Sequence, residues 1–491
     1  MRKWLAALGL VVLALTVVVS VKTVATPSRQ LVVASAAPVA VDARAASERL
    51  AAAVRLKTIA STTDADANAA EFLALHAHLQ ASFPKLHAAL RRDVIGKYGL
   101  LYTWLGSDSQ AAPIALLAHE DVVPIAPGTD GDWQALPFSG SQRDGFVWGR
   151  GAWDDKSNLM GILEAVELRV GAGFQPRQTI YLAFGHDEEL GGARGAMKIA
   201  QLLKERGVHL RWVIDEGLLI TEGAVAGLAH PAALVGVAEK GFLTVRLTAS
   251  AAPGHSSMPP VEAGSSAIGM LVRALTRIEA EQMPFSLGGV GRESLDALAP
   301  EMDVVHRVLL SNLWLFGPLV EAELKQSPGG NASFRTTTAL TVVNAGQAEN
   351  VLPGRASALV NFRLLPGDRS EDVVAHVVRA IAEPRIKVER EPDFVEASRV
   401  ASTDAVGYRT IARTLAELHP DVVVAPGLMI GATDSRHYAN VADNIYRFSP
   451  MRARPEDLKR FHGTNERIST ANYVELIQFY HQLIGNAQPD A

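Results

Sequence analysis

The fold of this chain is decided by the stretch Thr179-Ile180-Tyr181-Leu182-Ala183-Phe184-Gly185-His186-Asp187-Glu188-Glu189-Leu190-Gly191-Gly192. An apolar, aromatic run of strand length ends in a block of acids, and a pair of glycines follows. In an open α/β sheet, functional groups gather at the carboxyl ends of the strands. Adjacent carboxylates repel each other unless a cation or a shared proton relieves the repulsion. Alone, this pattern fits a solvated loop as well as a functional site.

Two further segments repeat the pattern. Pro113–Asp121 is an apolar run that ends in His119-Glu120-Asp121, and Arg211–Gly217 is one that ends in Asp215-Glu216. Buried strands of one sheet would bring these groups to the same edge. Imidazole and carboxylate ligands together suit zinc or a similar divalent ion. The strand ends therefore predict a metal site.

Length and composition bound the class of protein. The chain has 491 residues, more than one ordinary hydrophobic core holds, so we expect two domains. Hydrophobic residues make up 48% and charged residues 20%, which is typical of a globular protein. A formal net charge of −5 argues against a nucleic-acid partner. The absence of cysteine excludes disulfides, thiolate metal sites and cysteine nucleophiles.

The N-terminus has the pattern of a targeting segment. Met1-Arg2-Lys3 is basic, and Trp4–Val21 is apolar apart from Thr16 and Ser20. Such a segment is either a cleaved signal peptide or a single membrane anchor, and residues 1–40 are therefore set apart from the fold. In both cases we expect an exported protein, which is periplasmic or secreted, or anchored with its catalytic domain outside the cytoplasm.

Strands alternate with helices in the first half of the chain. Residues 45–58, 65–81, 154–168 and 193–205 are predicted as helices, and strands are predicted at 100–105, 113–118, 179–184 and from 211. This alternation indicates an α/β fold, a mostly parallel sheet sandwiched by helices.

The pattern changes near residue 237. Strands predicted at 240–248, 336–343 and 356–364 alternate polar and apolar residues, as half-exposed strands do. Helices at 265–278 and 371–382 and a strand at 386–391 complete a small α+β unit over 237–392. A helix at 405–418 and strands near 422 and 445 then return to the first pattern. The unit is thus predicted as an insertion in a larger domain of residues 45–236 and 393–491, which holds the predicted metal site. No role is assigned to about 280–330.

The segment Gly149–Ser157 adds a fourth acidic element. Asp154 and Asp155 stand where a helix begins, and aspartate is a common N-cap there. Beside the three strand ends, Asp154 is better interpreted as a carboxylate that bridges two cations.

Taken together, these motifs resemble a known family. His119-Glu120-Asp121, Gly149–Lys156 and Asp187-Glu188-Glu189 are similar to motifs of the co-catalytic di-zinc metallopeptidase family of aminoacylase, carboxypeptidase G and carboxypeptidase S. The resemblance runs from about Ala45 to Leu483 and includes Gly254–Ser257, Gly431–Arg436 and Phe461–Gly463. Within the family, the chain is most similar to carboxypeptidase S and the secreted N-fatty-acyl-amino-acid hydrolase/synthase, through Ser311–Phe316, Arg335–Leu340 and Val213–Gly217. The family implies a zinc-peptidase-like catalytic domain with an inserted lid or dimerisation domain.

The resemblance implies two Zn²⁺ ions, for which other divalent ions such as Co²⁺ are alternatives. The implied ligands are His119, Asp154, Glu189, Asp215 and His462, with Asp154 between both metals. Relatives differ in which acid of the pair Asp215-Glu216 binds, and the nearer branch favours Asp215. Asp121 would orient the ring of His119.

The resemblance also implies the groups that act on the substrate. Glu188 would be the general base for the attacking water. His255 would stabilise the oxyanion from the inserted unit, often that of a partner subunit, which implies a homodimer; otherwise it is a surface loop histidine. Arg436 would bind the free carboxylate of the substrate, unless it forms an ion pair with Asp434. Asn350 would contact the substrate through its amide.

The expected function is hydrolysis of the amide bond of an N-acyl or N-peptidyl amino acid with a free carboxylate. The acyl side stays open between a peptide and a fatty acyl chain, and the apolar residues 313–316 either line an acyl pocket or pack in a core. A second hypothesis is a catalytically inactive metal-binding protein of the same fold, against which the filled ligand positions argue. His76, His78 and His87 lie outside the motifs and are expected to be solvent-exposed.

Overall fold

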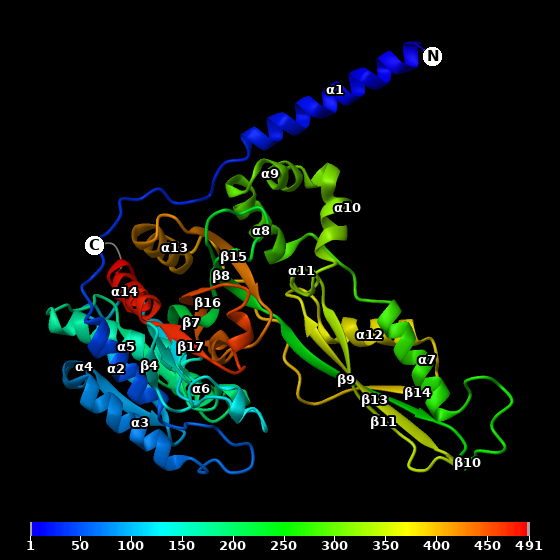
Figure 1. Ribbon diagram of the computed structural model, residues 1–491, viewed down its shortest axis with the longest axis horizontal. Coiled ribbons are helices and arrows are strands. Elements are labelled where there is room, and N and C mark those ends of the chain that lie inside the picture. The colour runs from blue at the N-terminus through cyan, green and yellow to red at the C-terminus, as the bar shows by residue number, and fades with distance from the viewer. Residues whose placement is uncertain (1, 489–491) are drawn as a thin grey trace.

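An eight-stranded mixed sheet forms the centre of the larger body in the computed structural model, which describes residues 2–488 (Figure 1). The central strands β6, β3, β7 and β16 run parallel, and antiparallel pairs occur at β1–β2, β2–β6 and β8–β16. In spatial order the strands are β1 (Arg91–Ile95), β2 (Gly99–Trp104), β6 (Ile180–Gly185), β3 (Ile114–His119), β7 (Leu210–Thr221), β16 (Ala442–Ala453), β8 (Ala232–Glu239) and β15 (Val423–Met429).

Helices cover both faces of this sheet, so the predicted α/β fold with a mostly parallel sheet is confirmed. Helix α6 (Ala196–Glu205) and the 3₁₀ segment η4 (Asp434–Asn440) cover one face. The helices on the other side are α2 (Ala43–Val54), α3 (Ala69–Ser82), α4 (Pro84–Ala89), α5 (Lys156–Gly171), α13 (Val406–Leu418) and α14 (Thr470–Asn486). The predicted stripe of α5 is fully buried, because a helix against a sheet hides its apolar side: Leu159, Ile162, Leu163 and Val166.

A second, antiparallel sheet forms most of the arm that extends from this body (Figure 1). Its order is β11 (Thr337–Ala345), β13 (Arg355–Leu364), β9 (Gly241–Ser250) and β14 (Ile386–Arg390), and it packs on α7 (Ala267–Ala280) and α12 (Ser370–Ile381). Burial alternates along β13, as the sequence pattern predicted. A short ladder of β10 (Gly254–His255) and β12 (Val351–Leu352) lies at the tip. The domain boundaries at 237 and 392 stay a prediction.

The segment to which the sequence gave no role is helical. It contains α8 (Gly289–Leu298), which contacts β15, followed by α9 (Val304–Ser311), α10 (Leu313–Leu324) and α11 (Pro328–Phe334). The N-terminal helix α1 (Arg2–Ala25) projects from the body beside α9 (Figure 1). A small sheet of β17 (Arg467–Ser469), β5 (Phe146–Trp148) and β4 (Ser141–Arg143) completes the body. Neither this sheet nor strand β8 had been predicted.

Candidate active site

Three neighbouring parallel strands deliver the predicted site residues to one edge of the large sheet. Strand β3 lies between β6 and β7, and its last residue, His119, stands opposite Gly185 at the end of β6. Glu188 and Glu189 follow β6 in a short 3₁₀ turn. Because the three strands are buried and parallel, their carboxyl ends lie together, as the sequence analysis expected.

Asp154 lies between two histidines that are far apart in the sequence. Its Oδ1 is 3.0 Å from Nε2 of His119, and its Oδ2 is 2.8 Å from Nε2 of His462. The same His462 nitrogen lies 3.3 Å from Oε2 of Glu189. Each oxygen of Asp154 therefore faces a different imidazole, which is the arrangement of a carboxylate shared by two metal ions. The peptide bond between Asp154 and Asp155 is cis.

Of the acid pair that ends the third predicted strand, Glu216 rather than Asp215 faces this cluster. Glu216 Oε1 is 3.6 Å from His119 Nε2. The carboxylate of Asp215 instead accepts hydrogen bonds from the backbone N–H groups of Glu216, at 2.9 Å, and Ser435, at 2.8 Å. The pairing of β7 with β16 shifts register after Asp215, and Gly217 has a φ of 149°. This bulge sets the directions of the two side chains, so Glu216, and not the expected Asp215, lies beside His119 in the structure, while the choice of metal ligand stays a prediction.

Asp121 connects the end of β3 to the turn after β6. Its carboxylate accepts hydrogen bonds from the backbone N–H groups of Glu188, at 3.0 Å, and Glu189, at 3.2 Å. Nδ1 of His119 is 2.9 Å from the backbone oxygen of Asp121 and 3.4 Å from its Oδ1. Asp121 thus lies where it can orient the His119 ring, and it also fixes the backbone that carries Glu188.

The acids of the cluster repel one another, and bound cations would relieve this repulsion. Burial raises the pKa of Glu188, of Glu189 and of Glu216, and nearby acids raise each further. Hydrogen bonds with Asp154 and Glu189 raise the pKa of His462 to about 10. Within residues 2–488, Oε1 of Glu189 is buried without a hydrogen-bond partner. Crowded, desolvated carboxylates around two imidazoles are the donor set that divalent metals satisfy.

A buried ion pair that the sequence analysis missed holds both loops of the cluster. Glu466 Oε1 accepts hydrogen bonds from the backbone N–H groups of Gly151, Trp153 and Asp154 at 2.8–3.1 Å. Its Oε2 lies 2.5 Å from Nη1 of Arg150, whose Nη2 donates to the backbone oxygens of His462 and Gly463. The pair therefore fixes the backbone on both sides of the His462–Asp154 contact. Burial raises the pKa of Glu466 to about 7, although Arg150 opposes the shift.

His255 and Asn350 lie together, but far from the metal-type cluster of their own chain. Both are at the tip of the arm, where Ser256 N donates to Asn350 O at 3.0 Å (Figure 1). His255 is exposed, and its Nδ1 lies 2.8 Å from Ser257 Oγ. Neither residue reaches the site of the chain to which it belongs.

Arg436 lies beside the turn that carries Glu188. Its Nη2 donates to Gly191 O at 2.7 Å, and no ion pair joins it to Asp434 among the described residues. Asp434 is buried in a cradle of glycines, since a Cβ on Gly185 or Gly192 would fall 2.1 Å from its oxygens. The ion-pair alternative for Arg436 is therefore wrong.

The expectation that the outlying histidines are all solvent-exposed is also wrong. His76 is only 8% exposed, and its Nε2 is 2.8 Å from Oε2 of Glu120, which stands between His119 and Asp121. His87 lies 3.1 Å from the hydroxyl of Tyr102. The helical spacing of the buried α3 residues Phe72, Leu75 and Leu79 was the signal that places His76 on the inner face.

Comparison with known proteins gives consistent matches over most of the chain. The profile of Peptidase family M20/M25/M40 matches residues 115–486. An N-fatty-acyl-amino acid synthase/hydrolase of Danio rerio is 43% identical over 440 residues, which cover 89% of this chain and 84% of that protein. A probable carboxypeptidase S-like protein of Dictyostelium discoideum is 41% identical over 445 residues, which cover 90% of this chain and 85% of that protein.

Solved structures share the fold at low sequence identity. An M20 family metallo-carboxypeptidase of Sulfolobus solfataricus has a TM-score of 0.62 at 15% identity, covering 90% of this chain and 99% of that one. A dinuclear metal binding peptidase of Bacillus subtilis, also from the M20 family, has a TM-score of 0.55 at 13% identity and covers 90% and 98%. These likenesses support the two-sheet architecture.

Proposed function

Because the chain belongs to Peptidase family M20/M25/M40, we propose that it hydrolyses the amide bond of an N-acyl or N-peptidyl amino acid with a free carboxylate. The observation that carries this proposal is Asp154, whose two oxygens face His119 and His462. The filled ligand positions, and the place of Glu188 beside His119 and Glu189, argue against a catalytically inactive relative.

The residues present fit two metal ions, which we propose to be zinc. His119, Asp154 and Glu216 would hold one ion, and Asp154, Glu189 and His462 the other, because the donor atoms within each group lie within 4.8 Å of one another. Imidazole and carboxylate donors suit zinc. When bound, two such ions would lower the pKa of a water and polarise the scissile carbonyl.

Glu188 is the proposed general base. Asp121 accepts a hydrogen bond from the backbone N–H of Glu188. One carboxylate oxygen of Glu188 lies within 4.8 Å of a ring nitrogen of His119 and a carboxylate oxygen of Glu189. A carboxylate in this position takes a proton from the attacking water and hands it to the nitrogen of the leaving amine.

Arg436 is proposed to bind the carboxylate of the substrate, and His255 and Asn350 to reach the site from the arm of a second copy. The tip of the arm is exposed in this chain, as a surface that serves a partner must be. Mixing inactive His255→Ala and Glu188→Gln proteins should then restore activity to roughly one quarter of the unmutated level, since half of the exchanged dimers hold one complete site. A mixture that stays inactive after verified subunit exchange contradicts the shared site.

The substrate class is tested by comparing the rate at which the protein hydrolyses an N-oleoyl amino acid with the rate at which it hydrolyses a dipeptide such as Gly-Leu. The names of the Danio rerio and Dictyostelium discoideum relatives suggest a fatty acyl amino acid and a peptide, respectively. The second candidate substrate is an N-fatty-acyl amino acid. The identity of the chain to the Danio rerio protein, 43%, supports this candidate. Failure on both substrates, with metal bound, would remove the proposed function. The apolar leader supports export, as a secreted or periplasmic protein or one anchored with its catalytic body outside the cytoplasm.

The choice between the adjacent acids predicts a difference in metal content. Glu216→Gln should lose about one of the two metal ions, because Glu216 faces His119, whereas Asp215→Asn should retain both. Metal analysis of the two purified variants, with circular dichroism as a check on folding, makes the comparison. The reverse result would return the ligand role to Asp215.

Metal binding should depend on pH with a defined sign. In the metal-free protein the pKa of His462 is raised to about 10, so its imidazole is protonated at neutral pH and a metal must displace that proton. Below that pKa, the apparent affinity for Zn²⁺ is expected to fall by about tenfold for each unit by which the pH is lowered, for each displaced proton. Titration calorimetry in buffers of different ionisation enthalpy counts the released protons. Affinity that is independent of pH would contradict the protonated state of His462.

A further inference from the structure

Helix α1 is long and apolar enough to cross a membrane. It has 24 residues, which corresponds to about 36 Å of helix against about 30 Å of hydrocarbon in a bilayer. Its large apolar side chains project away from the rest of the protein; Leu13, in the middle of the helix, is 61% exposed. By length and composition α1 fits a bilayer, and in that case the lipid would begin where α1 meets the body.

The end of α1 is attached to α9 and α10 by specific contacts. Asn312 Nδ2 donates to Oγ1 of Thr23 at 2.9 Å, and Arg307 Nε donates to the backbone oxygen of Thr23 at 3.3 Å. Nζ of Lys22 lies 5.5 Å from the ring centre of Trp314. These contacts place the end of α1 beside the start of α10.

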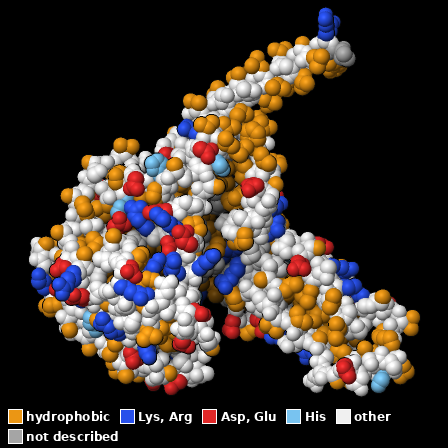
Figure 2. All heavy atoms as spheres, viewed as in Figure 1, with side chains coloured by type: hydrophobic (Ala, Val, Ile, Leu, Met, Phe, Trp, Pro, Cys, Tyr) orange, Lys and Arg blue, Asp and Glu red, His pale blue; other side chains and the backbone are white. Residues whose placement is uncertain are grey.

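The outer side of α9 and α10 is apolar at this place. Figure 2 shows hydrophobic side chains gathered where α1 meets the body. We define the α9–α10 surface by its exposed residues, with their exposed fractions: Val304 77%, Val305 65%, Trp314 50%, Leu315 39% and Leu319 59%. Both interpretations of residues 313–316 from the sequence, an acyl pocket and a core, fail for Trp314 and Leu315, because they face outward.

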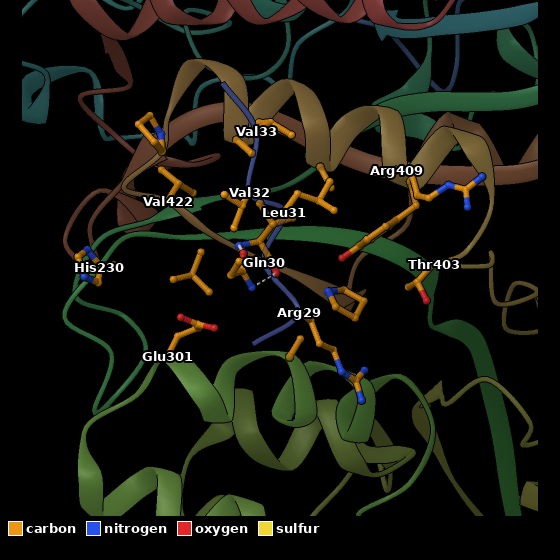
Figure 3. Close-up of a pocket in the computed structure, with 18 of the residues that line it drawn as sticks. Arg29, Gln30, Leu31, Val32, Val33, His230, Glu301, Thr403, Arg409 and Val422 are labelled. Carbon is orange, nitrogen blue, oxygen red and sulfur yellow. Dashed lines mark hydrogen bonds between the residues drawn. The ribbon is translucent and has the colours of Figure 1, made fainter. Parts of the chain in front are cut away.

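The linker after α1 is also fixed to the body. Gln30 exchanges two hydrogen bonds with the backbone of Val424 on the edge strand β15, at 3.0 and 2.8 Å (Figure 3). Arg29 lies 3.8 Å from Asp296 of α8, and the linker from Arg29 to Val33 runs through a cavity of about 760 Å³ between α8 and α13. α1 is thus not on a loose tether, and its attachment point sets how the body meets a membrane.

We propose that α1 remains on the mature protein and that the α9–α10 surface lies on the same lipid bilayer in which α1 is embedded. The occupant is lipid rather than a second copy of the chain, because the surface begins where α1, which is long and apolar enough to cross a bilayer, contacts α9 and α10. Trp314 has the amphipathic ring found at membrane interfaces, and the Lys22 chain can extend its ammonium group to the headgroups. The apolar side chains would enter about 5–10 Å into the headgroup boundary. This inference does not depend on the proposed function.

The absence of cysteine in the chain allows a direct test by single-cysteine labelling. Leu319→Cys, Leu13→Cys and Val94→Cys are each made in the full-length protein, labelled with an environment-sensitive fluorophore and placed in phospholipid nanodiscs. Leu13, in α1, is the lipid control. Val94 is the water control, since it is 50% exposed on β1, at the sheet edge opposite β15. We expect the label at 319 to shift to shorter wavelength and to be quenched by lipids with a nitroxide near the headgroup, and the label at 13 to be quenched best by a nitroxide deep in the chains.

Three outcomes would overturn the proposal. A label at 319 that emits and resists lipid quenching like the label at 94 would show a surface in water. A blue-shifted label at 319 that only a nitroxide on another copy of the chain quenches would show a protein partner instead. Intact-mass analysis of the protein recovered from membranes supplies the third, since removal of residues 1–25 would show that α1 is a cleaved leader.

Discussion

Replacing Glu188 with glutamine is expected to lower turnover by about 10²–10⁴-fold, because an amide cannot take a proton from the attacking water. Glutamine keeps the shape of the side chain, and Asp121 holds the backbone of residue 188 in either case. The metal content is therefore expected to remain that of the unmutated protein. Steady-state kinetics with saturating substrate and metal analysis of the same sample measure the two quantities together.

The matched control is the neighbouring acid. Glu189 lies 3.3 Å from His462 in the proposed second metal group, so Glu189→Gln should reduce metal content as well as turnover. Glu188→Gln with full turnover would remove Glu188 from the chemistry. Loss of metal from Glu188→Gln would instead show that Glu188 is a ligand.

Replacing Arg150 with methionine is expected to destabilise the protein by about 3–5 kcal/mol, because it leaves the buried carboxylate of Glu466 without its partner. The side chains of Arg150 and Glu466 are 2% and 0% exposed, so water cannot replace the lost contact. The backbone oxygens of His462 and Gly463 also lose a donor. We therefore expect weaker metal binding together with a lower free energy of unfolding, as measured by denaturant titration of the metal-free and metal-loaded protein.

Two further variants separate this effect from a general loss of charge. Arg44→Met removes an exposed arginine whose side chain lies 2.9 Å from Glu48 on the surface, and it should lower the free energy of unfolding far less than Arg150→Met does. Adding Glu466→Gln to Arg150→Met should recover part of the stability, because a neutral amide oxygen still accepts the backbone hydrogen bonds without burying a charge. Equal effects of Arg150→Met and Arg44→Met would refute the role of the buried pair.

The sequence predicted the edge of the sheet where the site lies, because buried parallel strands have a simple signature. The runs that end at His119 and Gly185 are apolar throughout and stop abruptly at polar groups. The alternation of strands and helices predicted that these strands run parallel in one sheet. At this edge of the sheet the local apolar pattern of each strand agrees with its place in the buried sheet, so the sequence alone predicts it.

The sequence could not decide between Asp215 and Glu216 for a physical reason. Adjacent residues of a regular strand point to opposite faces, but the bulge after Asp215 depends on the register with β16, more than 200 residues later in the chain. The pair of Arg150 and Glu466 was missed for the same reason: 316 positions separate the two residues. Contacts of this kind are made by tertiary packing and leave no local pattern.

Helix α10 was missed because it breaks the usual amphipathic rule. It is apolar on its buried side and on much of its exposed side, so no continuous polar stripe marks a face. Periodicity cannot identify a helix whose buried and exposed sides are both apolar. The exposed apolar residues that obscured the helical pattern of α10 are the same residues that form part of the α9–α10 surface.

The position of β16 in the sheet has a consequence for how the chain reaches its native state. β7 and β8 pair directly at one end, and β16 lies between the two strands in the order of the sheet. During synthesis, this central place stays open until residues 442–453 have left the ribosome, well after the whole arm. His462, which follows β16, arrives later still. A chain that forms the rest of this sheet during synthesis therefore leaves the place between β7 and β8 unfilled until β16 is added, and such non-local pairing favours slow folding.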